Sequence, residues 1–286
     1  MKLFQTSVNY SLRFKSRPLC SRLAAQIVRK IVFLAVFGLM PTVYVGCEHN
    51  EANTKQAQTA YDIGVTNFQN NRMREAIYHF EQALQFDPNY ALAHNSLGLL
   101  YHSLKRYDDA LRHYKKAIDI DPKMSEAKNN LASVYIDQGL YDKAIPLLQE
   151  ALADLFYKTP FMAESNLGWA LYKKGDIQEG ISRTRKAVLF NPSFCMGFRN
   201  LGIMYEETNE LTLAEKHFTS YAKKCPKTPD AHYRLGLVQA KLDKVDEARE
   251  SFAECKLNAS EASELSDECA KLEAALGPST SKRGDL

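Results

Sequence analysis

Several absences in the sequence narrow the class of protein. The 286 residues include only 13 glycines and 10 prolines, too few for a loop-rich all-β chain or a low-complexity chain. The six cysteines are too dilute for a disulfide scaffold. Apolar residues make up 45% and charged residues 25%, which excludes a chain that is disordered throughout or one that crosses a membrane many times.

The motifs that catalysis needs are also missing. The sequence has no glycine-rich loop to cradle a phosphate, no Gly-x-Ser-x-Gly turn and no cysteine–histidine arrangement that suggests a nucleophile. Its seven histidines lack partners at metal-ligand spacing: His49, His79, His94, His102, His113, His217 and His232. We therefore expect no enzyme, cofactor, metal or small-molecule substrate, and we interpret the histidines as surface or inter-helix residues.

Acidic residues are absent from the first 46 positions, which hold seven basic residues. The net charge of +3 for the whole chain therefore becomes −4 over residues 47–286. A nucleic-acid-binding surface needs clustered basic residues, so we expect no nucleic-acid partner.

The N-terminal segment has the pattern of a targeting signal. Arg29 and Lys30 precede an uncharged run from Ile31 to Cys47, which is 17 residues long and is interrupted by Pro41. A membrane-spanning helix needs about 20 apolar residues. A basic start, a short apolar stretch and a small residue before the cleavage point are typical of a signal peptide instead. We predict a leader and signal peptide at 1–46.

The end of this segment, Tyr44-Val-Gly-Cys47, resembles the lipobox of bacterial lipoproteins, although Tyr44 stands where leucine is usual. The resemblance implies cleavage before Cys47 and lipidation of its thiol, with a linker at 47–56, and Glu48 favours delivery to the outer membrane. The alternative is a short membrane anchor with an incidental cysteine. Residues 1–27 are long for such a signal, so we expect Val28 to be the initiator; a mitochondrial transit peptide is the competing interpretation.

A period of 34 residues governs the rest of the chain. Counted from Ala57, small residues recur at position 8 of each period: Gly64, Gly98, Ala132, Gly168, Gly202 and Gly236. Position 24 is mostly large: Phe80, Tyr114, Leu148, Thr184, Phe218 and Phe252. This pattern resembles the tetratricopeptide repeat, in which small residues let two helices approach and a large residue fills the space between them.

The resemblance implies an all-α fold, a right-handed α-solenoid of six tetratricopeptide repeats with a C-terminal capping helix. The repeats are expected at 57–90, 91–124, 125–160, 161–194, 195–228 and 229–262. The third is two residues longer, and Leu155–Pro160 replaces the usual Asp-Pro turn. An amphipathic segment at 263–276 is expected to cap the array, before a polar tail at 277–286.

In this repeat the first helix lines the concave face. Position 9 there is apolar in five of six repeats: Val65, Leu99, Ser133, Trp169, Ile203 and Leu237. An exposed apolar row marks an interaction site and suits an amphipathic helix, although the solenoid's curvature would also bury part of it. The predicted partner-binding residues are Tyr61, Val65, Phe68, Leu92, Leu99, Ile136 and Trp169. Asn130, Asn166 and Asn200 could bond a peptide backbone.

We place this binding site mainly in repeats 1 to 3, with a smaller contribution from Trp169. The nine residues 48–56 separate the predicted anchor from repeat 1 and span at most roughly 30 Å. A partner that inserts into the same membrane would therefore meet the first repeats before the last.

Four cysteines remain beyond the predicted lipidation site: Cys195, Cys225, Cys255 and Cys269. An even number fits two disulfides with three possible connectivities, and it favours an oxidising compartment. Because the helices of a repeat are antiparallel, we predict Cys195–Cys225 and Cys255–Cys269. Four buried free thiols are the alternative.

Three segments, Leu155–Phe161, Ser165–Gly175 and Asn191–Gly202, resemble the type IV pilus pilotin family (the Tgl, PilF and PilW lipoproteins). The resemblance implies a non-enzymatic assembly factor that is lipid-anchored in the outer membrane, faces the periplasm and binds an outer-membrane secretin. The alternative is a general periplasmic scaffold lipoprotein that tethers cell-wall or envelope proteins. A neighbouring secretin gene would favour the first, and a neighbouring cell-wall synthase gene the second.

Overall fold

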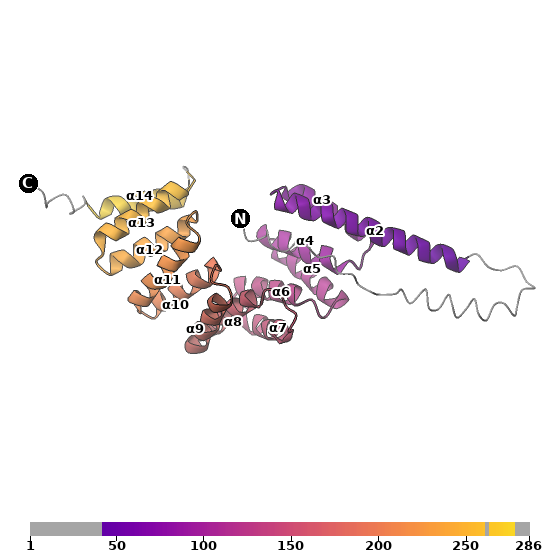
Figure 1. Cartoon of the computed structure of the whole chain (residues 1–286), viewed down its shortest axis with the longest axis horizontal. Helices are drawn as coiled ribbons and strands as arrows, with labels where there is room; N and C mark the ends of the chain where they lie inside the picture. The colour runs from indigo at the N-terminus through magenta and orange to yellow at the C-terminus, as the bar shows by residue number, and fades with distance from the viewer. Residues whose placement is uncertain (1–41, 261–262, 278–286) are drawn as a thin grey trace, which may run out of the picture. The chain divides into compact units, whose positions relative to one another are not determined.

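A computed structural model describes residues 42–260 and 263–277 (Figure 1), so most of the predicted signal peptide and of the polar tail lies outside it. Over these two ranges the secondary structure is helical, without any strand. The all-α prediction is therefore confirmed.

The helices follow one another in pairs, one pair for each expected repeat, and a single helix ends the series. The pairs are α2 (Thr42–Gln69) and α3 (Met73–Phe86), α4 (Ala91–Ser103) and α5 (Tyr107–Ile120), α6 (Ser125–Asp137) and α7 (Tyr141–Ala153), α8 (Pro160–Lys174) and α9 (Ile177–Phe190), α10 (Cys195–Glu207) and α11 (Leu211–Lys224), and α12 (Pro229–Lys241) and α13 (Val245–Asn258), followed by α14 (Glu264–Ala275).

The chain divides between Pro122 and Lys123 into two compact units. Unit 1 contains repeats 1 and 2, from α2 to α5. Unit 2 contains repeats 3 to 6 and α14.

The second helix of each repeat buries one stripe of side chains. In α3 the stripe is Ala76, Phe80 and Ala83, at the spacing i, i+4, i+7 that places residues on one face of an α-helix. The same spacing recurs elsewhere, with Ala110, Tyr114 and Ala117 in α5, Ala144, Leu148 and Ala151 in α7, and Ala214, Phe218 and Tyr221 in α11. Burial of this apolar stripe stabilises each helix against its neighbours.

The small residue at position 8 allows close approach of the large residue at position 24. A Cβ atom added to Gly64 would lie 2.6 Å from the Phe80 ring, and one added to Gly98 would lie 2.6 Å from the Tyr114 ring. A larger residue at either position would require the facing ring or its helix to move. Repeat 4 differs, because a Cβ atom on Gly180 would lie 2.7 Å from the backbone oxygen of Gly168. There the two helices meet backbone to backbone.

The turn inside every repeat contains a residue with a left-handed backbone conformation, always at position 15. These residues are Asn71, Lys105, Gly139, Gly175, Asn209 and Asp243. Five of them are of the types that tolerate positive φ, namely glycine, asparagine and aspartate. Lys105, with φ of 58°, is the exception.

Two connections depart from the regular pattern. The exit from repeat 3 takes residues 154–159 between α7 and α8, whereas the other exits that the structure describes in full take four residues. At the N-terminus, α2 already begins at Thr42, so the expected linker at 47–56 is helical. Between Cys47 and Ile63 the sequence has no glycine or proline to interrupt a helix. In a helix, nine residues rise about 14 Å, about half their extended reach.

The backbone of Cys47 lies in α2, but its side chain, where lipidation is predicted, is outside the described part of the chain. Within that part, no helix has both the length and the apolar character needed to cross a membrane.

Unit 2 brings the two predicted cysteine pairs to disulfide distance. Cys195, the first residue of α10, is paired with Cys225, which follows α11, and their Cα atoms are 6.2 Å apart. Cys255 of α13 is paired with Cys269 of α14, also with Cα atoms 6.2 Å apart. The first bond would close repeat 5, and the second would attach the capping helix to repeat 6.

Candidate functional site

The predicted apolar row lies on the first helices and is neither fully exposed nor fully buried. Val65 on α2, Leu99 on α4, Trp169 on α8 and Leu237 on α12 are half-buried, while Ile203 on α10 is buried. Packing between repeats therefore covers part of the row, as the alternative interpretation expected. The remainder is accessible to a partner.

In unit 1 the most accessible of the predicted residues is Leu92, at the start of α4, with 44% of its surface exposed. Tyr61 on α2 is used mainly for packing. Its ring centroid lies 5.4 Å from that of Phe80 and 5.3 Å from that of Tyr90, and its hydroxyl accepts a hydrogen bond from Ser96 at 3.5 Å. Burial raises the pKa of Tyr61. The ring therefore connects α2 with α3 and α4, and only part of it is accessible.

Phe68 lies seven residues after Tyr61 on α2 and is half-buried, like Val65 and Leu99. The five predicted residues of unit 1 thus come from two first helices, α2 and α4. Their side chains offer apolar and aromatic surface without a charge, which is the chemistry that an apolar partner segment requires.

In unit 2, Ile136 on α6 is half-buried, and Trp169 on α8 has a charged neighbour. The Trp169 ring stacks on Tyr172 with centroids 6.1 Å apart, and Lys173 Nζ lies 4.7 Å from the Trp169 centroid. Lys173 also pairs with Glu207 on α10 at 2.9 Å. Burial, and secondarily Glu207, raises the pKa of Tyr172 to about 12. This region therefore presents a cation over an aromatic ring, unlike the uncharged set in unit 1.

Two of the asparagines predicted to bind a peptide backbone bond to neighbouring repeats. Asn166 donates to the side-chain oxygen of Asn129 at 3.0 Å, and Asn200 donates to the hydroxyl of Ser165 at 3.2 Å. These bonds link α8 to α6 and α10 to α8. In this structure the two amides join first helices to one another.

Two histidines bond to the turn before their helix. The Nε2 atom of His94 lies 3.2 Å from the carbonyl oxygen of Pro88, and that of His232 lies 2.8 Å from the carbonyl oxygen of Pro226. Both histidines stand at position 4 of a repeat, and both prolines stand at position 32 of the preceding one. The contact is therefore a recurring link between consecutive repeats.

Two further histidines stand at position 23 and stack on the tyrosine at position 11. The centroid distances are 5.5 Å for His113 on Tyr101 and 5.3 Å for His217 on Tyr205. Burial lowers the pKa of both histidines to about 4, and for His113 the neighbouring His94, with Nδ1 atoms 3.0 Å apart, adds to the shift. Both imidazoles are therefore neutral packing groups at neutral pH.

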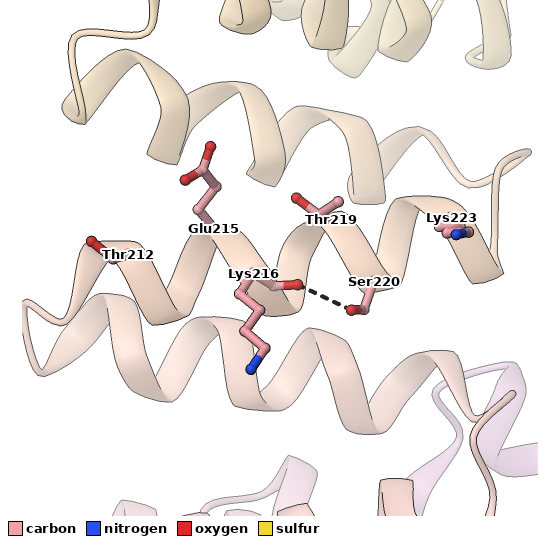
Figure 2. A pocket seen from close by; sticks show the side chains of 6 residues that line it. All are labelled: Thr212, Glu215, Lys216, Thr219, Ser220 and Lys223. Atoms are coloured by element: carbon pink, nitrogen blue, oxygen red, sulfur yellow. Dashed lines mark hydrogen bonds between the residues drawn. The ribbon is translucent and has the colours of Figure 1, made fainter.

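A pocket of about 480 Å³ lies on unit 2, and Figure 2 shows the side chains that line it. Its lining comes from one helix, α11: Thr212, Glu215, Lys216, Thr219, Ser220 and Lys223. Ser220 donates to the backbone oxygen of Lys216 at 3.0 Å, and Glu215 pairs with Lys244 at 2.6 Å. The pocket therefore lacks a set of polar groups that converge from several elements. Among the described residues, no group of three or more His, Cys, Asp or Glu side chains could hold a metal ion.

Two exposed apolar pairs in unit 2 were not predicted from the sequence, and together we call them the apolar corner. It consists of Leu155 and Phe156 in the exit from repeat 3 and of Leu189 and Phe190 at the end of α9. The available signal was at position 32, where Phe156 stands in place of the proline found in four other repeats. Because loops run over the surface, an apolar residue in place of this proline is expected to be exposed.

Comparisons with known proteins agree with this architecture. Family models described as the tetratricopeptide repeat match residues 91–124, 125–154 and 199–261, and a further model described as the TPR repeat matches residues 64–105. Together they cover more than half of the chain. A search of curated proteins found no match.

Solved structures with the same fold include PilW, described as a widely conserved type IV pilus biogenesis factor, with a TM-score of 0.66 and 22% identity over 75% of this chain and 98% of PilW. PilF of Pseudomonas aeruginosa matches with a TM-score of 0.63 and 18% identity over 77% of this chain and 99% of PilF. The Cut9–Hcn1 part of the APC/C matches with a TM-score of 0.65 and 18% identity over 91% of this chain and 53% of the other. At these identities the likeness shows the fold alone. The repeat pattern, the helix pairs and the family models together show that this chain belongs to the tetratricopeptide-repeat proteins.

Proposed function

We propose that this protein is a pilotin, a non-enzymatic assembly factor that binds a segment of a type IV pilus secretin. In this proposal it is anchored by a lipid on Cys47 in the outer membrane and faces the periplasm. The observation that carries the proposal is the extent of the match with PilW and PilF, whose chains are covered over 98% and 99% of their length. The match with Cut9–Hcn1 covers 53% of that chain, as expected when only the repeat is shared.

The surface of unit 1 supports a binding role. Leu92 is exposed, and Val65, Phe68 and Leu99 keep part of their surface accessible although a fully packed solenoid could have covered them. An amphipathic segment of the partner could bury its apolar face there at about 25 cal/mol per Å², before the cost of association is counted. Binding by shape and apolar contact needs no catalytic group.

The helical course of α2 supports a short distance between anchor and binding site. If Cys47 carries the lipid, the nine following residues add about 14 Å as a helix. A secretin segment that approaches the same membrane would then meet α2 and α4 first. The two cysteine pairs in unit 2 support an oxidising compartment, because such pairs persist as disulfides outside the reducing cytosol.

The anchor is tested by replacing its cysteine. Cys47→Ala should leave the protein without a lipid and release it from membranes, because alanine has no thiol to carry the acyl chains on which stable anchoring depends. Metabolic labelling with a fatty acid measures this directly. Label that persists on the Cys47→Ala variant would disprove lipidation at this residue.

The partner is tested by purifying the full chain from solubilised membranes and identifying bound proteins by mass spectrometry. We expect a secretin to be recovered, and to assemble poorly in cells that lack this protein. Recovery of a cell-wall synthase without a secretin would instead support a general envelope scaffold and would contradict the pilotin proposal.

A further inference from the structure

The apolar corner is held in a fixed conformation and is not a loose loop. Asp154 accepts a hydrogen bond from the backbone N–H of Phe156 at 2.9 Å and another from the hydroxyl of Ser125 on α6 at 2.7 Å. Tyr157, the next residue, is buried. Between these two fixed points Leu155 and Phe156 are 94% and 90% exposed. The local structure therefore presents two large apolar side chains to the surroundings.

A second apolar pair lies at the same end of the α8–α9 hairpin. The exit from repeat 3 enters α8 at Pro160, and α9 ends beside that point because the two helices are antiparallel. The rings of Phe161 and Phe194, with centroids 5.0 Å apart, connect the start of α8 with the turn after α9. Leu189 and Phe190, the last two residues of α9, are 79% and 58% exposed.

The exposed charges within one helical turn of Leu189 and Phe190 are positive. Arg185 and Lys186 precede Leu189 and Phe190 by one helical turn each, and Lys186 Nζ lies 5.6 Å from the centroid of the Phe190 ring. Between Glu179 and Glu206 the sequence has no acidic residue. The acid on the adjacent helix, Glu164, is buried and is paired with Lys186 and Arg183.

We propose that the apolar corner is a membrane-contact site, at which Leu155, Phe156, Leu189 and Phe190 enter the interface of a lipid surface that carries anionic headgroups. Exposed aromatic and aliphatic side chains with Arg and Lys nearby are the groups that bind such interfaces. The four side chains offer on the order of 500 Å² of apolar surface, less than the roughly 800 Å² per partner of a stable protein interface. A fluid lipid surface needs no matching partner shape, so a small rigid corner is sufficient.

The site rests on the proposed function in one respect. A lipid anchor on Cys47 would keep the corner near a membrane and so raise its effective concentration there. The residues of the corner are distinct from the partner-binding residues of unit 1, and each site can be lost without the other.

The test uses a tryptophan probe at the corner in the full chain. Trp169, the only tryptophan, is changed to Phe, and Phe156→Trp is compared with Leu257→Trp, a control at the end of α13 where the native leucine is 77% exposed. Both variants are mixed with vesicles of phosphatidylethanolamine and brominated phosphatidylglycerol, and with vesicles of brominated phosphatidylcholine. Quenching of tryptophan emission reports entry into lipid, and flotation reports attachment of the chain.

We expect Phe156→Trp to be quenched several-fold more than Leu257→Trp in the anionic vesicles, and Arg185→Glu to reduce that quenching. Equal quenching of the two probes, or none at position 156, would overturn the proposal. Quenching of the position-156 probe that is as strong in phosphatidylcholine vesicles as in the anionic vesicles would also overturn it. Quenching or a blue shift that appears only when solubilised partner protein is added would assign the corner to a protein instead. If the chain floats with the vesicles but the probe at position 156 is not quenched, the lipid anchor is retained and the membrane-contact site is disproved. Failure of the anchor and failure of the membrane-contact site are therefore distinguishable.

Discussion

The same residue pattern occurs in repeats 1 and 2 and in repeats 5 and 6, but different contacts hold the repeats together in these two regions. In repeats 1 and 2 a ring and its hydroxyl make the connection, because Tyr90 packs on Tyr61 and donates to the side-chain oxygen of Gln58 at 2.6 Å. In repeats 5 and 6 two cysteine pairs close repeat 5 and attach the capping helix.

The difference shows that different residues hold the two helices of a repeat together and join one repeat to the next. The pair is closed by the glycine at position 8 and the large residue at position 24, and this contact is the same at both ends of the array. The contacts that join one repeat to the next differ between the two regions. Among the described residues, repeats 1 and 2, the proposed binding region, are joined without a disulfide, whereas the last exposed face of the solenoid is covered by a helix that a disulfide would hold in place.

The largest expected effect concerns the contact that both regions share. Phe80 and Phe218 are 1% and 0% exposed, and each faces a glycine. Phe80→Ala and Phe218→Ala should each lower the free energy of unfolding of their region by about 3–5 kcal/mol, because each leaves a cavity. Denaturant unfolding followed by hydrogen exchange measures both. A large loss in one region with almost none in the other would contradict the view that the same contact between positions 8 and 24 stabilises both regions.

The next effect should appear in one region only. Removing both cysteines of a pair, as in Cys195→Ser with Cys225→Ser or in Cys255→Ser with Cys269→Ser, should cost about 2–4 kcal/mol each. Hydrogen exchange should accelerate in repeats 5 and 6 and stay unchanged in repeats 1 and 2. Non-reducing peptide mapping of protein extracted from the cell envelope provides the control, and four free thiols there would rule out the disulfides.

Acid should weaken both regions, because each contains a buried neutral histidine stacked on a tyrosine. Burial lowers the pKa of His113 and His217 from 6.5 to about 4. The unfolded chain therefore binds more protons between these values, and stability falls as the pH decreases from about 6.5 to about 4. Stability measured at pH 7 and pH 5 should differ less for His217→Gln than for the unchanged protein. An unchanged difference would contradict the neutral, buried state of His217.

A small effect is expected at the turn inside repeat 2. Lys105 has φ of 58°, a conformation that costs a residue with a Cβ atom roughly 1 kcal/mol. Lys105→Gly should therefore raise the melting temperature. Gly139→Ala is the matched control, because Gly139 has φ of 71° with no atom near an added Cβ, and it should lower the melting temperature by the strain alone. If both changes act in the same direction, backbone strain at position 15 is not the cause.

The sequence predicted the helix pairs well because a small residue recurs at position 8 in all six repeats and a large residue at position 24 in five of them. Gly98 and Tyr114 predict their own contact from spacing alone, and the pairing of Cys195 with Cys225 follows from the antiparallel course of α10 and α11. Local spacing sets these features, so they can be derived without knowledge of the rest of the chain.

The binding surface was harder to predict, because exposure depends on neighbouring repeats. Position 9 gives the same pattern for Leu99 and Ile203, yet one is half-buried and the other is buried. Tyr61 matched the pattern of a binding residue, but its ring packs against Phe80 and Tyr90. The start of α2 was missed because helix propensity alone, without a packed partner, is a weak signal.

The most direct measurement concerns the row on the first helices of unit 1. Leu99→Asp places a charge in its centre, and Tyr78→Asp places the same charge on α3 at a side chain that is 57% exposed. Both variants should keep their helical content. We expect Leu99→Asp to abolish recovery of the secretin from solubilised membranes and Tyr78→Asp to leave it unchanged, with Trp169→Asp having a smaller effect. Normal recovery with Leu99→Asp together with loss of recovery with Trp169→Asp would contradict a binding site in the first repeats.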